Sequence, residues 1–362
     1  MFTFFFPIIA ILYLPVSLLA STHHLPNALS ALHLSPNAHI HLRDTPGYTD
    51  LAKRWSYWAA PDIAAIIEVA TTLDVAETIR FANAHDVPYL AQSGAHGTTA
   101  SLGAVKNGIL IHLRRLDSIT VSQDGSYATI GGGVKGVEVR DELWKLGKWT
   151  VTGLCECPGF VALALGGGHG ILQGRYGLLS DQVLGMEVVL ANGSAVTVSA
   201  SSHADLFWAM QGAGHNFGVV TSMRYKVYDV PQTEVGGRVW SHEMLTYEAT
   251  KENVESVFGL ARDMLEEGRQ PEELMLYGAA ATDSESGRLV IMQHCEFRMH
   301  VECIALTHTQ SSIMHHSHTS DPTQRLTMPS RPSLQSQMKG RISTSLVGWA
   351  TTPRAWRVIR LA

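Results

Sequence analysis

The sequence predicts an α+β protein of about two domains, and three observations lead to this expectation. The chain has 362 residues, which is enough for a sizeable core. Strand-like and helix-like segments alternate from about residue 64 to residue 146. Beyond Pro231 the pattern changes to a long amphipathic helix over residues 247–267 and strands over 274–281 and 289–293, which is typical of an antiparallel α+β unit.

The composition is that of a folded protein and argues against one class of partner. Hydrophobic residues make up 45% of the chain and charged residues 16%. The formal net charge is -5 at pH 7, whereas binding to a phosphate backbone needs a basic face. No nucleic-acid partner is therefore expected.

Residues 1–20 form an apolar run without a charge that ends in small residues, which indicates a cleaved signal peptide. A membrane anchor is the competing interpretation, but Pro7 and Pro15 interrupt the run and no basic stop-transfer flank follows. We therefore expect a secreted protein with no membrane attachment after cleavage. Its mature N-terminal segment would cover residues 21–55.

Residues 56–230 are expected to form the first domain. A strand over 64–70 leads to a helix that Thr72 can cap and that has Asp74 in its first turn. The next strand opens at 88–90. Further strands are expected over 108–113, 118–121, 127–130, 186–190, 195–198 and 219–227, and helices over 137–146 and 206–210.

The last part of the chain, from residue 231, differs from the first domain in its sequence pattern and composition. Residues 231–300 read as a partial second domain. Residues 301–362 contain a long stretch rich in Ser, Thr, His, Gln and Pro with little periodicity, and such a composition cannot easily build a core. We expect a disordered or aberrant tail there.

The first candidate binding segment is QSGAHGTT at residues 92–99, directly after a strand. Glycines let backbone N–H groups point into one concavity, which suits a pyrophosphate. His96 would then lie next to whatever the loop holds. The alternative is an ordinary histidine in a turn.

A second segment, GGGVKG at residues 131–136, satisfies the G-x-G-x-x-G dinucleotide pattern between a strand and a helix. Glu156 lies about twenty residues beyond it, where a ribose-binding acid is expected. Against an NAD site, the unit lies in the middle of the chain and no second mononucleotide half follows.

Two more glycine-rich segments follow. GGGHG at residues 166–170 precedes GRYG at 174–177, and closely spaced glycine segments suggest a backbone that wraps an extended, planar ligand. In ADLFWAMQGAGHNFGVVT at residues 204–221, a helix, a glycine-rich turn and an apolar strand follow in order. Structural turns are the alternative for both.

In their order and spacing, these segments resemble one family. ADLFWAMQGAGHNFGVVT is the most distinctive, and SGAHG and LGGGHGILQGRYGLLSDQ support it. They resemble the FAD-linked oxidoreductases with a PCMH-type FAD-binding domain, in the vanillyl-alcohol-oxidase superfamily. The berberine-bridge-enzyme-like and oligosaccharide-oxidase branch is the most similar. The resemblance covers about residues 55–230.

The resemblance implies two α+β subdomains that hold FAD through loop amides, followed by an incomplete antiparallel α+β substrate domain. His96 aligns with the histidine that bonds the flavin 8α-methyl group, so covalent FAD is expected. The other cofactor-binding residues that it implies are Gln92, Ser93, Gly94, Ala95, Gly97, Thr98, Thr99, Gly153, Cys155, Gly167, Gly168, His169, Gly170, Tyr176, Gly214, Asn216, Gly218 and Val219.

Cysteine usage adds one open question. The four cysteines are Cys155, Cys157, Cys295 and Cys303, and the first two are too close in sequence for an easy mutual disulfide. Many relatives carry a second covalent flavin link through a cysteine shortly before the glycine triplet. Cys155 stands about there, so attachment through Cys155 and a small buried thiol are both open.

The resemblance also implies the reaction. A small-molecule substrate, such as an alcohol, a sugar or a secondary metabolite, would deliver hydride to the flavin while a base takes its proton, and O2 would accept the electrons. The family base is usually a tyrosine in a C-terminal segment that returns to the FAD domain. We expect no such segment in this sequence, since full-length family members continue well beyond it. The last tyrosine here is Tyr277, so the catalytic residue stays unknown.

Two hypotheses from other classes remain. A flavin-binding pseudoenzyme is consistent with the missing C-terminal half, and peroxide production would exclude it. A secreted metal-binding protein is suggested by His315, His316 and His318 among 18 histidines. That cluster lacks carboxylates and an ordered scaffold, so no metal site is predicted.

Overall fold

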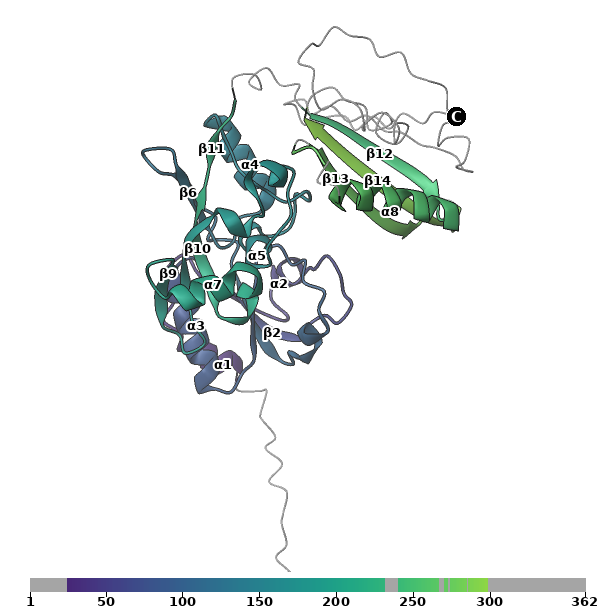
Figure 1. Ribbon diagram of the computed structural model, residues 1–362. Coiled ribbons are helices and arrows are strands. Elements are labelled where there is room, and N and C mark those ends of the chain that lie inside the picture. Colours follow the sequence, from purple (N-terminus) through teal and green to yellow (C-terminus); the bar gives the residue numbers. More distant parts are fainter. Residues whose placement is uncertain (1–24, 232–239, 267–269, 273, 285, 299–362) are drawn as a thin grey trace, which may run out of the picture.

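The computed structural model describes residues 25–231, 240–266, 270–272, 274–284 and 286–298 (Figure 1). The expected signal peptide and tail lie outside the described residues. Helices and four sheets make up the described part, which confirms the α+β class. Within these ranges, none of the helices combines the length and the apolar character that a bilayer crossing requires.

The first sheet carries the loop that contains His96. Its strand order is β1-β2-β4-β3, with β2, β4 and β3 parallel and β1 antiparallel to β2. Gln92 and His112 are register partners at the ends of β3 and β4, so the loop after Gln92 leaves from that edge. The elements are α1 (Leu25–Leu29), β1 (His39–Leu42), α2 (Tyr48–Leu51), β2 (Ile63–Glu68), α3 (Thr72–Ala84), β3 (Tyr89–Gln92), η2 (Ala100–Ala104) and β4 (Gly108–His112).

Helix α3 begins with a capping box, one residue earlier than the sequence suggested. Thr71, not Thr72, is the N-cap: its side chain accepts a hydrogen bond from the Asp74 N–H at 3.1 Å. The Asp74 carboxylate in turn accepts from the Thr71 N–H at 2.9 Å. Two adjacent threonines leave the capping position ambiguous in sequence, and the reciprocal bond from Asp74 decides it.

The Asp74 carboxylate also organises the chain around the helix start. It accepts hydrogen bonds from the N–H and hydroxyl of Ser35 and from the Ala70 N–H. Burial by itself raises the pKa of Asp74, but the bonds from Ser35, Ala70 and Thr71 outweigh it, and the pKa lies below its ordinary value. The ionised form is therefore the stabilising one.

Replacing Asp74 with asparagine should lower the free energy of unfolding by about 1–3 kcal/mol at neutral pH, because an amide loses the charge-assisted bonds. Because the pKa of Asp74 is lowered in the folded state, its carboxylate stabilises the fold fully above the unfolded-state pKa of about 4. This stabilisation disappears as the pH falls through the folded-state pKa. Urea unfolding at neutral pH and at about pH 3 should show the difference shrinking in acid. The exposed Asp44→Asn is the control. A deficit independent of pH would contradict the assignment.

The second sheet is antiparallel, in the order β5-β6-β10-β8-β9. Tyr225 of β10 is fully buried, packs edge-on against Phe160 at 4.8 Å between ring centroids, and donates its hydroxyl to the Val151 carbonyl. The elements are β5 (Ile119–Val121), β6 (Tyr127–Gly131), α4 (Gly136–Lys145), β7 (Lys148–Trp149), α5 (Phe160–Leu165), α6 (Gln173–Tyr176), η3 (Ser180–Gln182), β8 (Val183–Val189), β9 (Ala195–Ser199), α7 (Ala204–Ala213), η4 (Gly214–Asn216), β10 (Val219–Lys226) and β11 (Tyr228–Asp229).

The two sheets share one apolar interior. Val189 of β8 and Val219 of β10 belong to the same buried cluster as Ala65 and Ile109 of the first sheet. Helix α3 contacts strands of both sheets. The Thr72 and Thr221 hydroxyl oxygens are 2.9 Å apart. Helix α3 therefore joins the two sheets.

The GGGVKG segment at residues 131–136 is not a dinucleotide-binding turn. It does link a strand, β6, to a helix, α4, but β6 is antiparallel to both of its neighbours, so there is no parallel βαβ unit. A Cβ on Gly133 would overlap the carbonyl oxygen of Leu113. The glycines serve close backbone packing, which removes the basis for an NAD site there.

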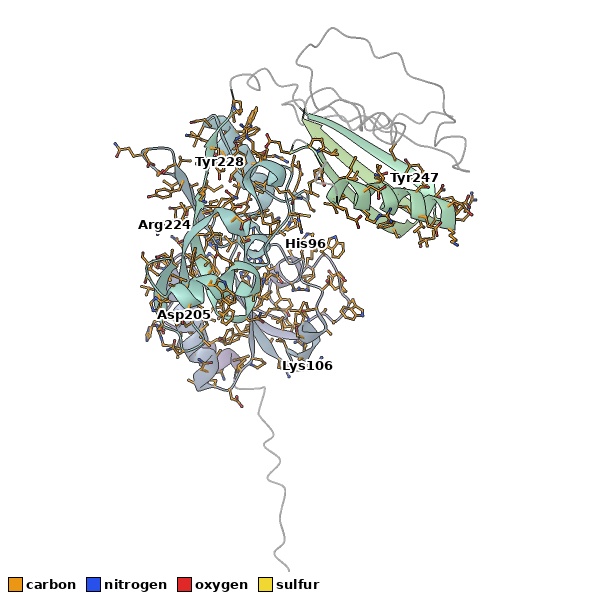
Figure 2. All side chains as sticks on the ribbon, in the orientation of Figure 1. His96, Lys106, Asp205, Arg224, Tyr228 and Tyr247 are labelled. Atoms are coloured by element: carbon orange, nitrogen blue, oxygen red, sulfur yellow. The ribbon has the colours of Figure 1, made fainter. Side chains whose placement is uncertain are left out.

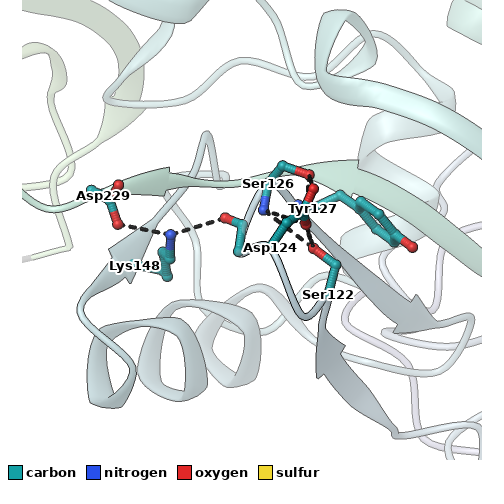
Figure 3. Close-up of polar contacts among 7 residues, drawn as sticks. Ser122, Asp124, Ser126, Tyr127, Lys148 and Asp229 are labelled. Atoms are coloured by element: carbon teal, nitrogen blue, oxygen red, sulfur yellow. Dashed lines mark hydrogen bonds and ion pairs between the residues drawn. The ribbon is translucent and has the colours of Figure 1, made fainter.

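A polar turn joins β5 to β6 and is tied to the small β7–β11 ribbon (Figure 3). Asp124 accepts hydrogen bonds from the hydroxyls of Ser122 and Ser126. Lys148 donates to the Gly125 carbonyl at 2.9 Å and pairs with Asp229 at 2.7 Å. The ribbon is thereby fixed to the end of the second sheet.

The remaining sheet is three-stranded, has the order β12-β14-β13 and is covered by one helix (Figure 1). Its elements are β12 (Trp240–Glu248), α8 (Lys251–Glu266), β13 (Leu274–Thr282) and β14 (Leu289–Arg298). The helix expected from residue 247 begins only at Lys251, since Tyr247 and Glu248 pair with β14. Sequence reasoning missed β12. Val257 of α8 packs with Leu245 and Ile291, giving this unit its own small core.

Candidate cofactor site

The loop at residues 93–97, which carries His96 (Figure 2), leaves the edge of the first sheet and contacts the segment before β2. The Trp55 N–H donates to the Ala95 carbonyl at 3.2 Å. The Trp55 indole stacks on the His96 imidazole, with the ring centroids 5.4 Å apart. Ala95 has φ +57°, a left-handed conformation that is unfavourable for alanine. The surrounding contacts therefore hold the loop in one shape.

Gly94 brings this loop against a second, distant segment. A Cβ on Gly94 would lie 2.7 Å from the Cys157 carbonyl oxygen and would overlap the backbone nitrogen of Gly159. Only glycine permits this approach. It follows that residues 93–97 and 157–159 lie backbone against backbone, which is why His96 meets a cysteine.

His96 is partly buried and stays neutral more readily than a free histidine. Burial lowers its pKa, and the nearby Lys135 charge lowers it further. Its Nε2 lies 3.1 Å from the Cys157 Sγ. Among the described residues, Nδ1 makes no hydrogen bond. The imidazole therefore offers a nitrogen lone pair at neutral pH.

Two thiols lie beside His96. The Cys155 and Cys157 Sγ atoms are 3.2 Å apart, and both cysteines are exposed and free. The hydrogen bond with Cys155, followed by burial, raises the pKa of the Cys157 thiol. The sequence singled out Cys155, but Cys157 is the residue in hydrogen-bonding contact with His96. Cys155 is exposed, so it is not the small buried thiol considered as the alternative.

Arg54 was missed by the sequence reasoning; it is a cationic residue whose side chain contacts this loop. Its guanidinium donates to the Gln92 side chain at 2.7 Å and to the Gly97 carbonyl at 3.2 Å. Burial lowers its pKa, and its Nε is buried without a hydrogen-bond partner. Among the described residues it has no carboxylate partner. No sequence motif marks Arg54 among the other arginines of the chain; its contact with Gln92 in the folded protein identifies it.

The third glycine segment lies directly after α5. A Cβ on Gly153 would meet the Leu163 side chain, and His169 hydrogen-bonds through Nδ1 to the Gln173 side chain at 2.9 Å. The carbonyls of Gly167 and Gly168 accept from Ser180 and Leu179. A cavity of about 380 Å³ adjoins this segment, lined by His169, Gln173, Gly174, Gly177, Leu178, Asp181, Gln270, Pro271 and Glu272.

The fourth segment packs on the third. A Cβ on Gly214 would meet the Leu165 side chain, and Asn216 donates to the Ala213 carbonyl at 3.0 Å. Gly218 precedes β10, and the Val219 side chain is buried in the core that the two sheets share. Val219 therefore exposes no side chain to a ligand, and only its backbone could contact one.

The remaining predicted residues are placed as follows. Tyr176 stacks on Tyr228 with the ring centroids 3.9 Å apart, which is a packing contact. Ser93 lies against Gly159, and Gly170 lies against the Thr152 backbone. Thr98 and Thr99 are exposed before η2. The histidines 315, 316 and 318 lie outside the described residues, and no catalytic base can be assigned from the contacts.

The donor set fits a ligand that carries a pyrophosphate. A guanidinium that is partly buried and lacks a carboxylate is stabilised by an anion, and Arg54 has a buried nitrogen without a partner. The glycine loop beside it provides backbone N–H groups. A neutral imidazole and two thiols lie next to it.

Comparison with known proteins identifies the ligand class. Residues 63–199 match a family model described as an FAD binding domain. An FAD-linked oxidoreductase of Penicillium rubens, chyH, is 41% identical over 242 residues, which cover 67% of this chain and 47% of that protein. The chain thus spans about half the length of the curated relatives it matches.

Solved structures agree on the fold. 6-Hydroxy-D-nicotine oxidase from Arthrobacter nicotinovorans is similar with a TM-score of 0.64 and 29% identity, covering 75% of this chain and 58% of that one. Glucooligosaccharide oxidase from Acremonium strictum, which is described with a 6-S-cysteinyl, 8α-N1-histidyl FAD, has a TM-score of 0.59 and 23% identity, covering 71% and 52%.

Proposed function

Since the chain belongs to the FAD-linked oxidoreductases with a PCMH-type FAD-binding domain, we propose that the complete protein is a secreted oxidase of an alcohol, a sugar or a secondary metabolite. Bound FAD would supply the redox step, accepting hydride from the substrate and passing two electrons to O2. The observation that carries the proposal is the meeting of His96, on a glycine loop, with Cys155 and Cys157.

The protein's own residues would divide the work at the cofactor. Arg54 would supply positive charge to the pyrophosphate, and residues 92–99 would supply backbone N–H groups. His96 would form the covalent bond to the flavin 8α-methyl carbon through Nδ1, because its Nε2 is already engaged by Cys157. The bond would replace one C–H bond of that methyl group and the imidazole N–H bond, and the two electrons and two protons released would pass to O2. The covalent histidyl and cysteinyl FAD of the glucooligosaccharide oxidase supports this assignment.

Cys155 is the proposed second attachment point. Its thiol is exposed, and it lies within the same cluster as His96, in which all donor atoms are within 4.8 Å of one another. The remaining predicted residues, from Gly153 to Gly170 and from Gly214 to Gly218, would bound the ring system through their backbones.

The test is the colour of protein that is purified and then precipitated with acid. A yellow pellet that fluoresces after denaturing electrophoresis is expected, because a covalent bond survives unfolding. A colourless pellet with flavin in the supernatant would leave FAD binding intact and exclude covalent attachment. Hydrogen peroxide production during a screen of alcohols and sugars would separate an oxidase from a flavin-binding protein without catalysis.

A further inference from the structure

His96, Cys155 and Cys157 form a compact set of soft donor atoms. Cys157 Sγ lies 3.1 Å from His96 Nε2 and 3.2 Å from Cys155 Sγ, and all three donors lie within 4.8 Å of one another. The close approach at Gly94 holds the two loops together through their backbones. The three donors therefore come from two segments that are fixed before any ligand arrives.

This donor set has a chemistry apart from flavin attachment. Two thiolates and one imidazole are the protein ligands of some catalytic zinc sites, which keep a fourth position for water. Thiolates prefer thiophilic metals, whereas Mg²⁺ and Ca²⁺ prefer oxygen ligands. Both cysteines are exposed, so a solvent molecule can reach the fourth position.

We propose that, before the flavin is attached, His96, Cys155 and Cys157 bind one thiophilic divalent metal ion, with Zn²⁺ or Cd²⁺ as the matching class. Binding displaces the two thiol protons, so that the ion and two thiols give a metal dithiolate and two H⁺. The metal prevents covalent attachment of flavin, because an imidazole that binds the ion through Nε2 carries its proton on Nδ1 and has no lone pair there. This exclusion rests on the proposed attachment through His96, whereas the metal site itself does not.

The geometry needs only a small adjustment. With a metal–sulfur distance of about 2.3 Å, a tetrahedral site requires about 3.8 Å between the two sulfur atoms. The thiols start 3.2 Å apart and must separate by roughly 0.6 Å, which exposed side chains can do by rotation. Lys135 is the nearby cation that opposes the metal, since its charge acts on both His96 and Cys157.

The experiment uses the full chain produced without flavin, in a riboflavin-auxotrophic host under riboflavin limitation. Cd²⁺ is titrated while the ultraviolet charge-transfer absorption of cadmium thiolate is followed, with Co²⁺ as a second probe of coordination geometry. One metal equivalent with thiolate absorption is expected. Three variants are compared with the wild-type chain.

The first, Cys155→Ser/Cys157→Ser, should lose this absorption. The matched control, Cys295→Ser/Cys303→Ser, should keep it. His96→Ala should weaken binding on the order of tenfold or more, since even residues that only orient a ligand contribute that much. Equal binding by the Cys155/Cys157 double variant and the wild-type chain would overturn the site.

Competition tests the exclusion separately. Flavin-free chain loaded with Zn²⁺ should acquire no covalent FAD until a chelator removes the metal. Unchanged attachment in the presence of saturating Zn²⁺ would refute the exclusion. If metal-free chain also fails to attach FAD, the proposed covalent function fails, while the metal titration still decides the metal site.

Discussion

His96→Ala should abolish the histidyl link to the flavin. The imidazole is the only group on the 93–97 loop with a nucleophilic nitrogen, and its lowered pKa keeps that nitrogen unprotonated at neutral pH. Trp55 and Cys157 hold the imidazole ring in position, and alanine at residue 96 has no nitrogen that could bond to the flavin from that position. The measurement is the flavin carried by the peptide containing residue 96 after proteolysis and mass spectrometry.

Cys155→Ser and Cys157→Ser are the matched comparisons for this prediction. If Cys155 carries a second link, its serine variant should keep flavin on the His96 peptide and lose it from the Cys155 peptide. Cys157→Ser should slow attachment without removing the histidyl bond, because it removes a contact of Nε2 only. Flavin found on a peptide that contains none of these three residues would refute the attachment site.

Arg54→Met should weaken the binding of FAD and ADP about 10- to 100-fold, while riboflavin, which has no phosphate, should bind as before. A hydrogen bond to a charged group contributes about 1.5–3 kcal/mol, and a tenfold change corresponds to about 1.4 kcal/mol. Arg54 is a partly buried cation beside the glycine loop, without a carboxylate partner among the described residues. Binding is measured by titration in the His96→Ala background, where flavin exchanges freely.

Two variants control for a purely structural effect of Arg54. Arg54→Lys retains the charge and should lose less affinity for ADP than Arg54→Met. Arg43→Met removes a guanidinium that Asp62 already neutralises, so it should leave ADP binding unchanged. Equal losses for ADP and riboflavin would mean that Arg54 shapes the loop rather than meeting a phosphate.

The motifs of the first domain predicted much of its structure, because their constraints are local. Strand β2 and helix α3 follow from a short apolar run and a capping signal, and the bounds of the strand and the start of the helix were placed within one or two residues. The resemblance to FAD-linked oxidoreductases is confirmed over the FAD-binding domain. The assignment of His96 to the flavin remains a prediction.

What sequence reasoning missed depends on contacts between distant segments. Arg54 meets Gln92, and Cys157 meets His96, only because the chain folds back on itself, and neither pair has a sequence spacing that signals it. The start of α8 was misplaced because the apolar pattern continues from β12. Thr250, whose hydroxyl accepts from the Asn253 N–H at 3.2 Å, is the capping signal that separates strand from helix.

The joint interior beneath α3 has a consequence for how this protein loses its structure. Val189 and Val219 complete an apolar cluster whose other members come from before residue 117. Unfolding of either sheet would therefore expose apolar side chains of the other sheet to water. Denaturation of residues 25–231 should therefore occur as a single all-or-none event, coincident by fluorescence and circular dichroism. A fragment cut between the sheets, near Asp117, should be insoluble, because its exposed valine and isoleucine side chains would drive aggregation.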